Sequence, residues 1–227
     1  MELIINCKAY EPGMGKHAVT LARTAIFAAK KYNIQIALAV QPQDIMAVSA
    51  TGIPTFAQHI DAIKYGAHTG SISPCGVKKA GAQGTLLNHS ERKLSPAVLQ
   101  QSILLAKKAG LFVIACAATP TEAKQINSLN PDVIVVEPPE LIGTNTAVSQ
   151  AKPDVITKTI KAITTPVLCG AGIRHAKDVR KALELGAKGI LVSSAIVQAQ
   201  HPDTILAELA NEFREFRKSS ITTKYIN

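Results

Sequence analysis

Short apolar runs alternate with longer amphipathic stretches along nearly the whole chain of 227 residues. This pattern of an apolar run, a turn and an amphipathic stretch occurs about eight times and predicts a βα unit at each occurrence. The apolar runs are built from Val, Ile, Leu and Ala, which is typical of strands buried on both faces of a parallel sheet. Eight such units in about 220 residues favour an α/β fold with one domain, a closed (β/α)8 TIM barrel near its lower size limit.

Turn and capping residues set the boundaries of the repeat. We expect strands over residues 3–7, 34–40, 55–59, 83–87, 111–116, 133–136, 166–169 and 189–192. We expect helices over residues 15–31, 44–49, 96–108, 120–128, 153–162, 176–185 and 204–217, with a short one near Val77. Ser95 is suited to cap the helix over residues 96–108, and Gly110 follows its end. The barrel would span residues 1–217, and a polar C-terminal tail would occupy residues 218–227.

The alternative architecture is a doubly wound open sheet. Such a sheet would carry a G-x-G-x-x-G turn after its first strand, and the sequence has none there. Apolar residues make up 47% of the chain, charged residues 18%, and there is no Trp. A core built mainly from aliphatic side chains suits an α/β protein, so we keep the closed barrel as the prediction.

Cysteine placement and charge limit the environment and the partners. The four cysteines form no C-x-x-C pair and have no His at metal-ligand spacing, so no metal and no thioredoxin-like site is predicted. No window holds about 18 consecutive apolar residues, and the N-terminus resembles no export signal, so we expect a soluble, cytoplasmic protein without a membrane partner. The formal charge of +9 is spread along the helices, which favours small anionic substrates over nucleic acid as partners.

A carboxylate follows the predicted strand over residues 133–136. Glu137 comes directly after four β-branched residues, so it would lie half buried at the mouth of the fold. A carboxylate in that place is suited to act as a general base. Two prolines and a short amphipathic segment ending at a glycine come next, and they resemble a hinged flap over a reaction that must be kept dry. A simple strand-to-helix loop with an incidental glutamate is an equally good interpretation of this stretch alone.

The other strand ends bring polar and small residues to the same mouth, because all strands of a barrel end on one face. Small residues at the ends of the seventh and eighth strands leave backbone N–H groups free to hold a phosphate. Each feature alone has a structural explanation, such as a polar strand end or a tight turn. Glu91, for example, could simply pair with Lys8 or Arg92. The residues that converge are Asn6 and Lys8, Asn88 to Glu91 with His89 among them, Glu137, Gly170 to Gly172, and Ser193 with Ser194.

Four of these stretches resemble the motifs of triosephosphate isomerase, in particular of its short archaeal branch. They are Asn6-Cys7-Lys8, Leu87 to Glu91, Val136 to Thr144 and Cys169 to Ile173. The similarity extends in order and spacing over about residues 1 to 217, including Ala57 to Asp61 and His68 to Ser71.

The resemblance implies interconversion of dihydroxyacetone phosphate and D-glyceraldehyde 3-phosphate through an enediolate, a step of glycolysis and gluconeogenesis. Glu137 would move the proton between the two carbons, while a neutral His89 would polarise the carbonyl. Lys8 would supply positive charge to the oxyanion and the phosphate, and Asn6 a hydrogen bond that positions the substrate. A carbon acid needs one positioned base and fixed dipoles at the oxygen where charge accumulates, so this division of roles is chemically sound. No metal or organic cofactor is implied.

The resemblance also implies a phosphate site and a lid. The phosphate site would combine Asn6 and Lys8 with Ile142, Gly143, Gly172, Ser193 and Ser194. The lid would consist of Pro138, Pro139, Glu140, Leu141, Ile142, Gly143 and Thr144. Three departures from the family pattern bear on lid closure and phosphate affinity: Asn145 stands in place of a hinge glycine, Arg174 to Lys177 in place of a more acidic turn, and Ser193-Ser194 in place of Gly-Gly or Ala-Ser.

Assembly is the last implication. The loop of about residues 65–80 is long, and loops of this length are usually functional. In the resembled family it reaches a neighbouring subunit, so Thr69 would contact the neighbour's Asn6 and Lys8, and Thr69 and Glu91 would support the site from outside. We therefore expect a homo-oligomer, a dimer or a tetramer. Two other functions remain open: another phosphate-binding barrel isomerase or synthase, or a catalytically idle basic barrel that binds anions or RNA.

Overall fold

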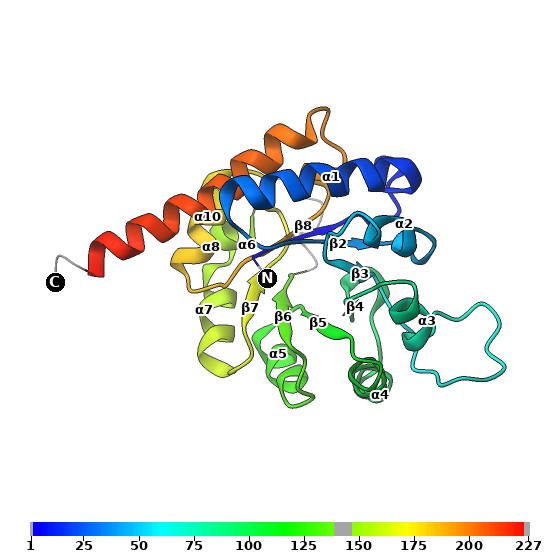
Figure 1. Ribbon diagram of the computed structural model, residues 1–227. Helices are drawn as coiled ribbons and strands as arrows, with labels where there is room; N and C mark the ends of the chain where they lie inside the picture. Colours follow the sequence, from blue (N-terminus) through cyan, green and yellow to red (C-terminus); the bar gives the residue numbers. More distant parts are fainter. Residues whose placement is uncertain (1, 139–146, 225–227) are drawn as a thin grey trace.

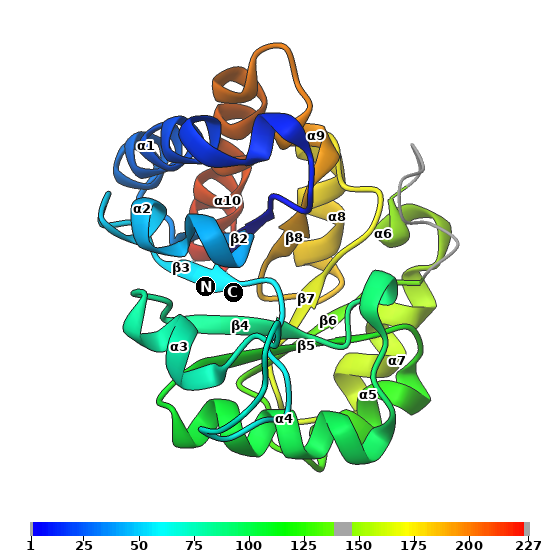
Figure 2. The same ribbon diagram turned by 90° about the vertical axis from the view of Figure 1, so that its right-hand side faces the viewer.

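The computed structural model describes residues 2–138 and 147–224. Eight parallel strands form a closed barrel in the order β1 to β8, and β8 returns to pair with β1, with Ile5 opposite Val192. Helices surround the barrel, and α1 and α10 lie side by side on its outside (Figures 1 and 2). The predicted (β/α)8 architecture is confirmed.

The strands are short and fully parallel. They are β1 (Leu3–Asn6), β2 (Ile36–Val40), β3 (Thr55–Ala57), β4 (Gly84–Leu87), β5 (Phe112–Ala117), β6 (Val133–Val136), β7 (Val167–Cys169) and β8 (Ile190–Val192). The α-helices are α1 (Gly15–Tyr32), α2 (Ile45–Ser49), α3 (Pro74–Lys79), α4 (Pro96–Lys108), α5 (Pro120–Asn127), α6 (Val148–Ala151), α7 (Pro153–Ala162), α8 (Ala176–Glu184), α9 (Ser194–Val197) and α10 (Pro202–Lys224). Three 3-10 helices, η1 (Glu11–Gly13), η2 (Pro42–Asp44) and η3 (Ser90–Arg92), complete the described elements.

The last helix differs most from the sequence prediction. It begins at Pro202 and continues to Lys224, whereas we expected it to end at Arg217 and a loosely ordered tail to follow. That end point is wrong, because residues 218–224 contain no Gly or Pro that would stop a helix. In Figure 1 the C-terminal end of α10 extends beyond the barrel. The division between barrel and tail at residue 217 stays a prediction.

Two apolar layers hold the barrel together. One layer fills the space between strands and helices, and includes Leu3, Ile5 and Leu38. The strand residues that alternate with those of the first layer form a second cluster: Ile4, Ala37, Ala39, Phe56, Leu86, Ile114, Cys116, Val133, Val135, Leu168 and Leu191. Since successive residues of a strand point to opposite faces, this second cluster fills the barrel interior. A side chain two residues after the last member of this cluster on a strand also points inward, and it lies at the mouth of the barrel.

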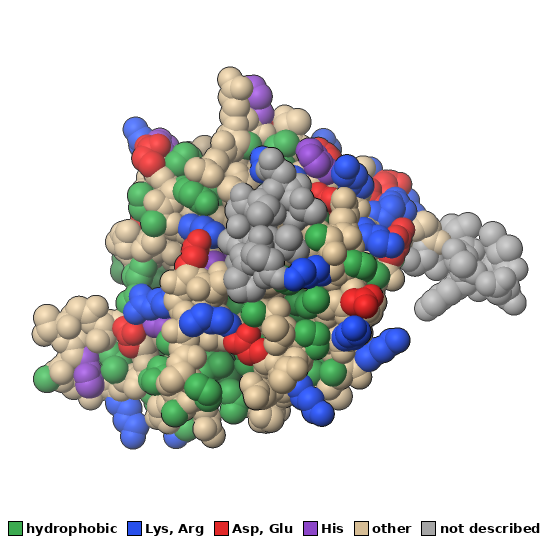
Figure 3. All heavy atoms as spheres, turned by 180° about the vertical axis from the view of Figure 1, so that it is seen from behind, with side chains coloured by type: hydrophobic (Ala, Val, Ile, Leu, Met, Phe, Trp, Pro, Cys, Tyr) green, Lys and Arg blue, Asp and Glu red, His purple; other side chains and the backbone are tan. Residues whose placement is uncertain are grey.

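The charged side chains are spread over the surface. On the face shown in Figure 3, Lys and Arg side chains are interspersed with acidic ones, and the described residues form no continuous basic stripe there. None of the helices in residues 2–138 and 147–224 combines the length and the apolar character needed to span a membrane.

Candidate active site

The barrel mouth gathers most of the residues expected to carry the chemistry. Six of them line one pocket: Lys8, His89, Glu137, Gly172, Ser193 and Ser194. The inward direction of the strand interiors explains this, because Glu137 lies two residues beyond Val135, and Ser193 two residues beyond Leu191. Asn6 has the same inward direction but is buried and contacts the pocket through Lys8. Residues separated by more than 180 positions in the sequence therefore share one cavity.

Lys8 is held in an unusual backbone conformation. Its φ is 49°, in the left-handed region that few non-glycine residues adopt. Asn6 Oδ1 accepts its backbone N–H at 3.1 Å, and the side-chain amides of Gln58 and Gln41 donate to its carbonyl at 3.0 and 3.3 Å. Together these three hydrogen bonds hold the Lys8 backbone in its strained conformation. Asn6 thus helps to hold the backbone of Lys8 in place. The direct hydrogen bond from Asn6 to substrate that we expected stays a prediction.

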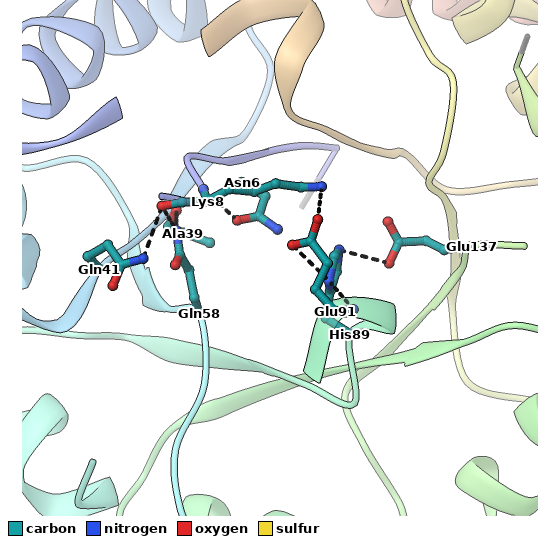
Figure 4. Close-up of polar contacts among 8 residues, drawn as sticks. All are labelled: Asn6, Lys8, Ala39, Gln41, Gln58, His89, Glu91 and Glu137. Atoms are coloured by element: carbon teal, nitrogen blue, oxygen red, sulfur yellow. Dashed lines mark hydrogen bonds and ion pairs between the residues drawn. The ribbon is translucent and has the colours of Figure 1, made fainter. Parts of the chain in front are cut away.

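The Lys8 ammonium points at a carboxylate from another strand end. Its Nζ lies 2.6 Å from Glu91 Oε1, and the Lys8 side chain is only 13% exposed (Figure 4). This is one of the two pairings that the sequence left open for Glu91. The other possible partner, Arg92, instead pairs with Asp61 at 3.2 Å. The ion pair fixes the ammonium at the pocket wall.

His89 presents one ring nitrogen to the pocket. It caps η3, and its Nδ1 accepts the backbone N–H of Glu91 at 3.2 Å. In a neutral ring Nδ1 is then the bare nitrogen and Nε2 carries the hydrogen. Nε2 lies 3.6 Å from Glu137 Oε2, and Figure 4 shows the ring between Glu91 and Glu137. The ring is therefore arranged as a hydrogen-bond donor toward the mouth.

The turn that carries His89 is anchored by Asn88. This residue has a φ of 58°, and its side-chain amide donates to Cys116 O and to Glu122 Oε1, both at 2.9 Å. Its Oδ1 accepts the N–H of Leu94 at 3.0 Å. Three hydrogen bonds from one side chain thus fix the β4 end relative to β5 and α5.

Glu137 is the least solvated carboxylate of the mouth. The residue is 4% exposed, and its Oε2 has no hydrogen-bond partner among the described residues. Buried polar atoms are normally satisfied, so an exception in a pocket indicates a functional group. Glycine at position 170 makes room for it, because a Cβ there would lie 2.4 Å from Glu137 Cγ. The bare oxygen is free to accept a proton.

Two buried thiols surround this carboxylate. Burial, followed by the negative charge of Glu137, raises the pKa of both the Cys116 and the Cys169 thiol. Burial likewise raises the pKa of the Cys7 thiol, to about 12, with Asp44 adding to the shift. The raised pKa values favour the protonated thiols over thiolate nucleophiles at neutral pH. Among the residues that the structure describes, no cluster of three His, Cys, Asp or Glu side chains could hold a metal ion.

The ends of β7 and β8 form the small-residue turns that were expected to hold a phosphate. Ala171 and Gly172 both have left-handed backbones, with φ of 69° and 71°. The short helix α9 begins at Ser194 beside them, and Ser193 Oγ is buried without a hydrogen-bond partner in the described part of the chain. Residues at the start of a helix have N–H groups without helical acceptors, which attract anions.

Other predicted residues fall elsewhere. Pro138 is buried directly after Glu137, whereas the remaining lid residues, Pro139 to Thr144 with Ile142 and Gly143 among them, lie outside the described residues. Thr69 is exposed on the long loop, away from the pocket. The loop is closed by Asp61, whose Oδ2 accepts Ile72 N–H at 2.6 Å.

Sequence reasoning missed the supporting residues Gln41, Gln58 and Asp61, and it placed Asn88 at the mouth without giving it a role. Asp61 also accepts from Arg92 at 3.2 Å and lies 3.1 Å from His59 Nε2, so it joins the long loop to the turn that bears His89. Gln58, His59 and Asp61 lie within Ala57 to Asp61, a stretch that resembles the family. That resemblance could have indicated their importance from the sequence.

Comparisons with known proteins agree with this geometry. A family model described as triosephosphate isomerase matches residues 1–212. The curated triosephosphate isomerase of Methanocaldococcus jannaschii is 40% identical over 215 residues, covering 92% of this chain and 98% of the relative. That of Saccharolobus solfataricus is 41% identical over 211 residues, with 91% and 93% coverage.

Solved structures give the same fold. A crystal structure of triosephosphate isomerase from Bartonella henselae superposes with a TM-score of 0.71 at 19% identity, covering 95% of this chain and 98% of that one. At this identity the likeness shows the fold, while the family model and the curated relatives show the family. The chain belongs to the triosephosphate isomerase family.

Proposed function

We propose that the chain interconverts D-glyceraldehyde 3-phosphate and dihydroxyacetone phosphate, with Glu137 as the general base. The proposal rests above all on Glu137 Oε2, which is buried, makes no hydrogen bond to any described residue and lies in one pocket with His89 and Lys8. A positioned carboxylate with one oxygen free of hydrogen bonds is what proton abstraction from carbon requires. Triose phosphates are the substrates that membership of the family implies.

The reaction follows from the placement of the donors. Glu137 takes the proton from C2 of the aldehyde substrate, and the electron pair moves to the carbonyl oxygen as the enediolate forms. The Nε2–H of His89 and the Lys8 ammonium stabilise the charge on the oxygens, because both face the same pocket as Glu137. The C2 hydroxyl gives up its proton and the C1 oxygen takes one up, and Glu137 then returns a proton to C1, which gives the ketone. No redox step occurs and no cofactor is needed.

The phosphate site belongs to the same proposal. Gly172, Ser193 and Ser194 would hold the phosphate with backbone donors, supported by the left-handed turn after β7 and by the start of α9. Ile142 and Gly143 of the proposed lid would complete it. Lid closure would keep water from the enediolate and prevent loss of phosphate.

The test is the replacement Glu137→Gln in a coupled assay with a glycerol-phosphate dehydrogenase. The amide is nearly isosteric but cannot accept the proton, so kcat should fall by at least about 10²- to 10⁴-fold with the fold intact. Glu184→Gln makes the same chemical change at an exposed residue of α8 and should leave kcat unchanged. A Glu137→Gln variant within tenfold of the parent would show that another group is the base.

We further propose a cytoplasmic homo-oligomer, a dimer or a tetramer. The loop around Thr69 supports this, because residues 64–71 are exposed in the isolated chain and Tyr65 is 72% exposed. Asp61 and Ile72 close the loop at its base through hydrogen bonds of 2.6 and 2.9 Å, so it is presented as a unit. The four cysteines are all free thiols, which fits a reducing compartment.

A further inference from the structure

The turn between β7 and α8 contributes a cationic residue, Arg174, to the lining of the substrate pocket, and the proposed chemistry has not used it. Arg174 follows the left-handed Gly172 by two residues, is half buried and lines the same pocket as Lys8, His89 and Glu137. Among the described residues that line the pocket, Lys8 and Arg174 are the two with cationic side chains. An arginine has five donors in a rigid fork, which suits the oxygens of a phosphate.

The backbone beneath this side chain is fixed. Asp178 Oδ2 accepts the N–H groups of both Arg174 and His175 at 3.0 Å, and Asp178 is 3% exposed. The other carboxylate oxygen of Asp178, Oδ1, accepts a hydrogen bond from the side-chain amide of Gln150. The backbone carbonyl of Asp178 accepts one from the Ser149 hydroxyl at 3.2 Å. Arg174 therefore starts from a Cα that is held firmly beside the small-residue turn, which reduces the entropy lost when its side chain engages a ligand.

The charges of the mouth show why a second cation matters. Lys8 is paired with Glu91 at 2.6 Å, and Glu137 adds a second carboxylate to the pocket. Without Arg174, Lys8, Glu91 and Glu137 together carry one net negative charge. This charge repels a phosphate ester, whose own charge is about −2. With Arg174 the described groups sum to zero. Backbone N–H groups contribute only partial charges, so they offset this repulsion incompletely.

We propose that Arg174 is a phosphate-recognition residue of this enzyme, one that offsets the carboxylates of the mouth and binds the phosphate of the triose phosphate through its guanidinium. The inference rests on the proposed function for the identity of the substrate. The site itself would take any small phosphate dianion, so inorganic phosphate serves as a probe that is independent of turnover.

The experiment compares Arg174→Gln, Arg174→Lys and Lys177→Gln with the parent enzyme. Lys177 is exposed three residues away and does not line the pocket, so Lys177→Gln removes the same charge from the neighbouring surface. Calorimetry would give the Kd of inorganic phosphate, the coupled assay would give KM and kcat, and thermal melting would report folding.

Arg174→Gln should weaken phosphate binding and raise KM by about tenfold, the effect of losing one charge-assisted hydrogen bond, with kcat changing less than KM. Arg174→Lys should recover part of the affinity, since it keeps the charge but not the fork. Lys177→Gln should stay within twofold of the parent in both quantities.

Two results would overturn the inference: a phosphate Kd and KM within twofold of the parent in Arg174→Gln, or an equal loss in Lys177→Gln. In either case Glu137-dependent isomerisation would leave the proposed function standing. Conversely, a parent enzyme that binds phosphate through Arg174 but does not isomerise triose phosphates would refute the proposed function and keep the inference.

Discussion

Gly170 controls the position of the proposed base, and replacing it with alanine should impair catalysis more than folding. A Cβ at this position would lie 2.4 Å from Glu137 Cγ, 2.7 Å from Oε1 and 2.9 Å from Cδ. Ordinary contacts are 3.4–4 Å, so the carboxylate would have to move by about 1 Å. A displacement of that size at a reacting group costs about 10²-fold in rate, or about 2.7 kcal/mol in the barrier.

The fold has reason to survive this change. Gly170 does not have a positive φ, and its N–H donates to Val136 O at 3.0 Å, a bond that alanine keeps. Glu137 lines the pocket, so the pocket offers space into which its carboxylate can shift. The assay is kcat in the coupled reaction, with the melting temperature measured in parallel.

Gly76→Ala is the matched control. Its Cβ would meet Ser73 Cβ at 3.4 Å, an ordinary contact, in a helix away from the pocket. Its kcat should equal that of the parent. A Gly170→Ala enzyme with kcat within threefold of the parent would refute the reasoning, because the carboxylate would then not depend on the space that glycine leaves.

Two further predictions concern the long loop and the pH dependence of stability. Thr69→Arg should lower both the association of subunits and kcat, while Thr20→Arg on exposed α1 should change neither; light scattering that finds the parent to be a fully active 24.0 kDa monomer would contradict the proposed assembly. Burial lowers the pKa of His59 from 6.5, although the hydrogen bond to Asp61 acts in the opposite direction. The unfolded chain therefore takes up this proton at a higher pH than the folded chain, so His59 should make the melting temperature fall as the pH is lowered below about 6.5. His59→Gln should reduce that fall, and an identical pH profile in parent and variant would show that His59 is not responsible.

Most elements could be predicted from the sequence because their boundaries have local causes. The helix Pro96–Lys108 was predicted to the residue, since Ser95 accepts from Val98 N–H at its start and Gly110 adopts a positive φ after its end. The strand Val133–Val136 was also predicted exactly as long as it is, from its β-branched run. The short helices α6 and α9 were missed, because four residues carry no amphipathic period that could reveal them.

The site could be predicted only as a set of strand ends. That Glu137, His89 and Lys8 meet follows from closing the barrel, but their contacts depend on side chains far apart in sequence. The sequence left Lys8 and Arg92 open as partners of Glu91, and because Lys8 and Glu91 are 83 positions apart, no local pattern could decide between them. Left-handed backbones at Lys8 and Ala171 are equally hidden, since neither residue type favours them. They arise from hydrogen bonds and packing that only the folded chain provides.

Proton transfer through Glu137 is the central claim, and solvent exchange tests it most directly. The enzyme would convert D-glyceraldehyde 3-phosphate in D2O, and NMR would locate deuterium in the product. In the turnovers in which the Glu137 carboxyl group exchanges its proton with solvent before returning one to C1, deuterium should appear at C1 of dihydroxyacetone phosphate. Glu137→Gln should yield no labelled product at the same enzyme concentration. Labelling by Glu137→Gln at the parent rate would contradict the account, because the proton would then reach C1 without this carboxylate.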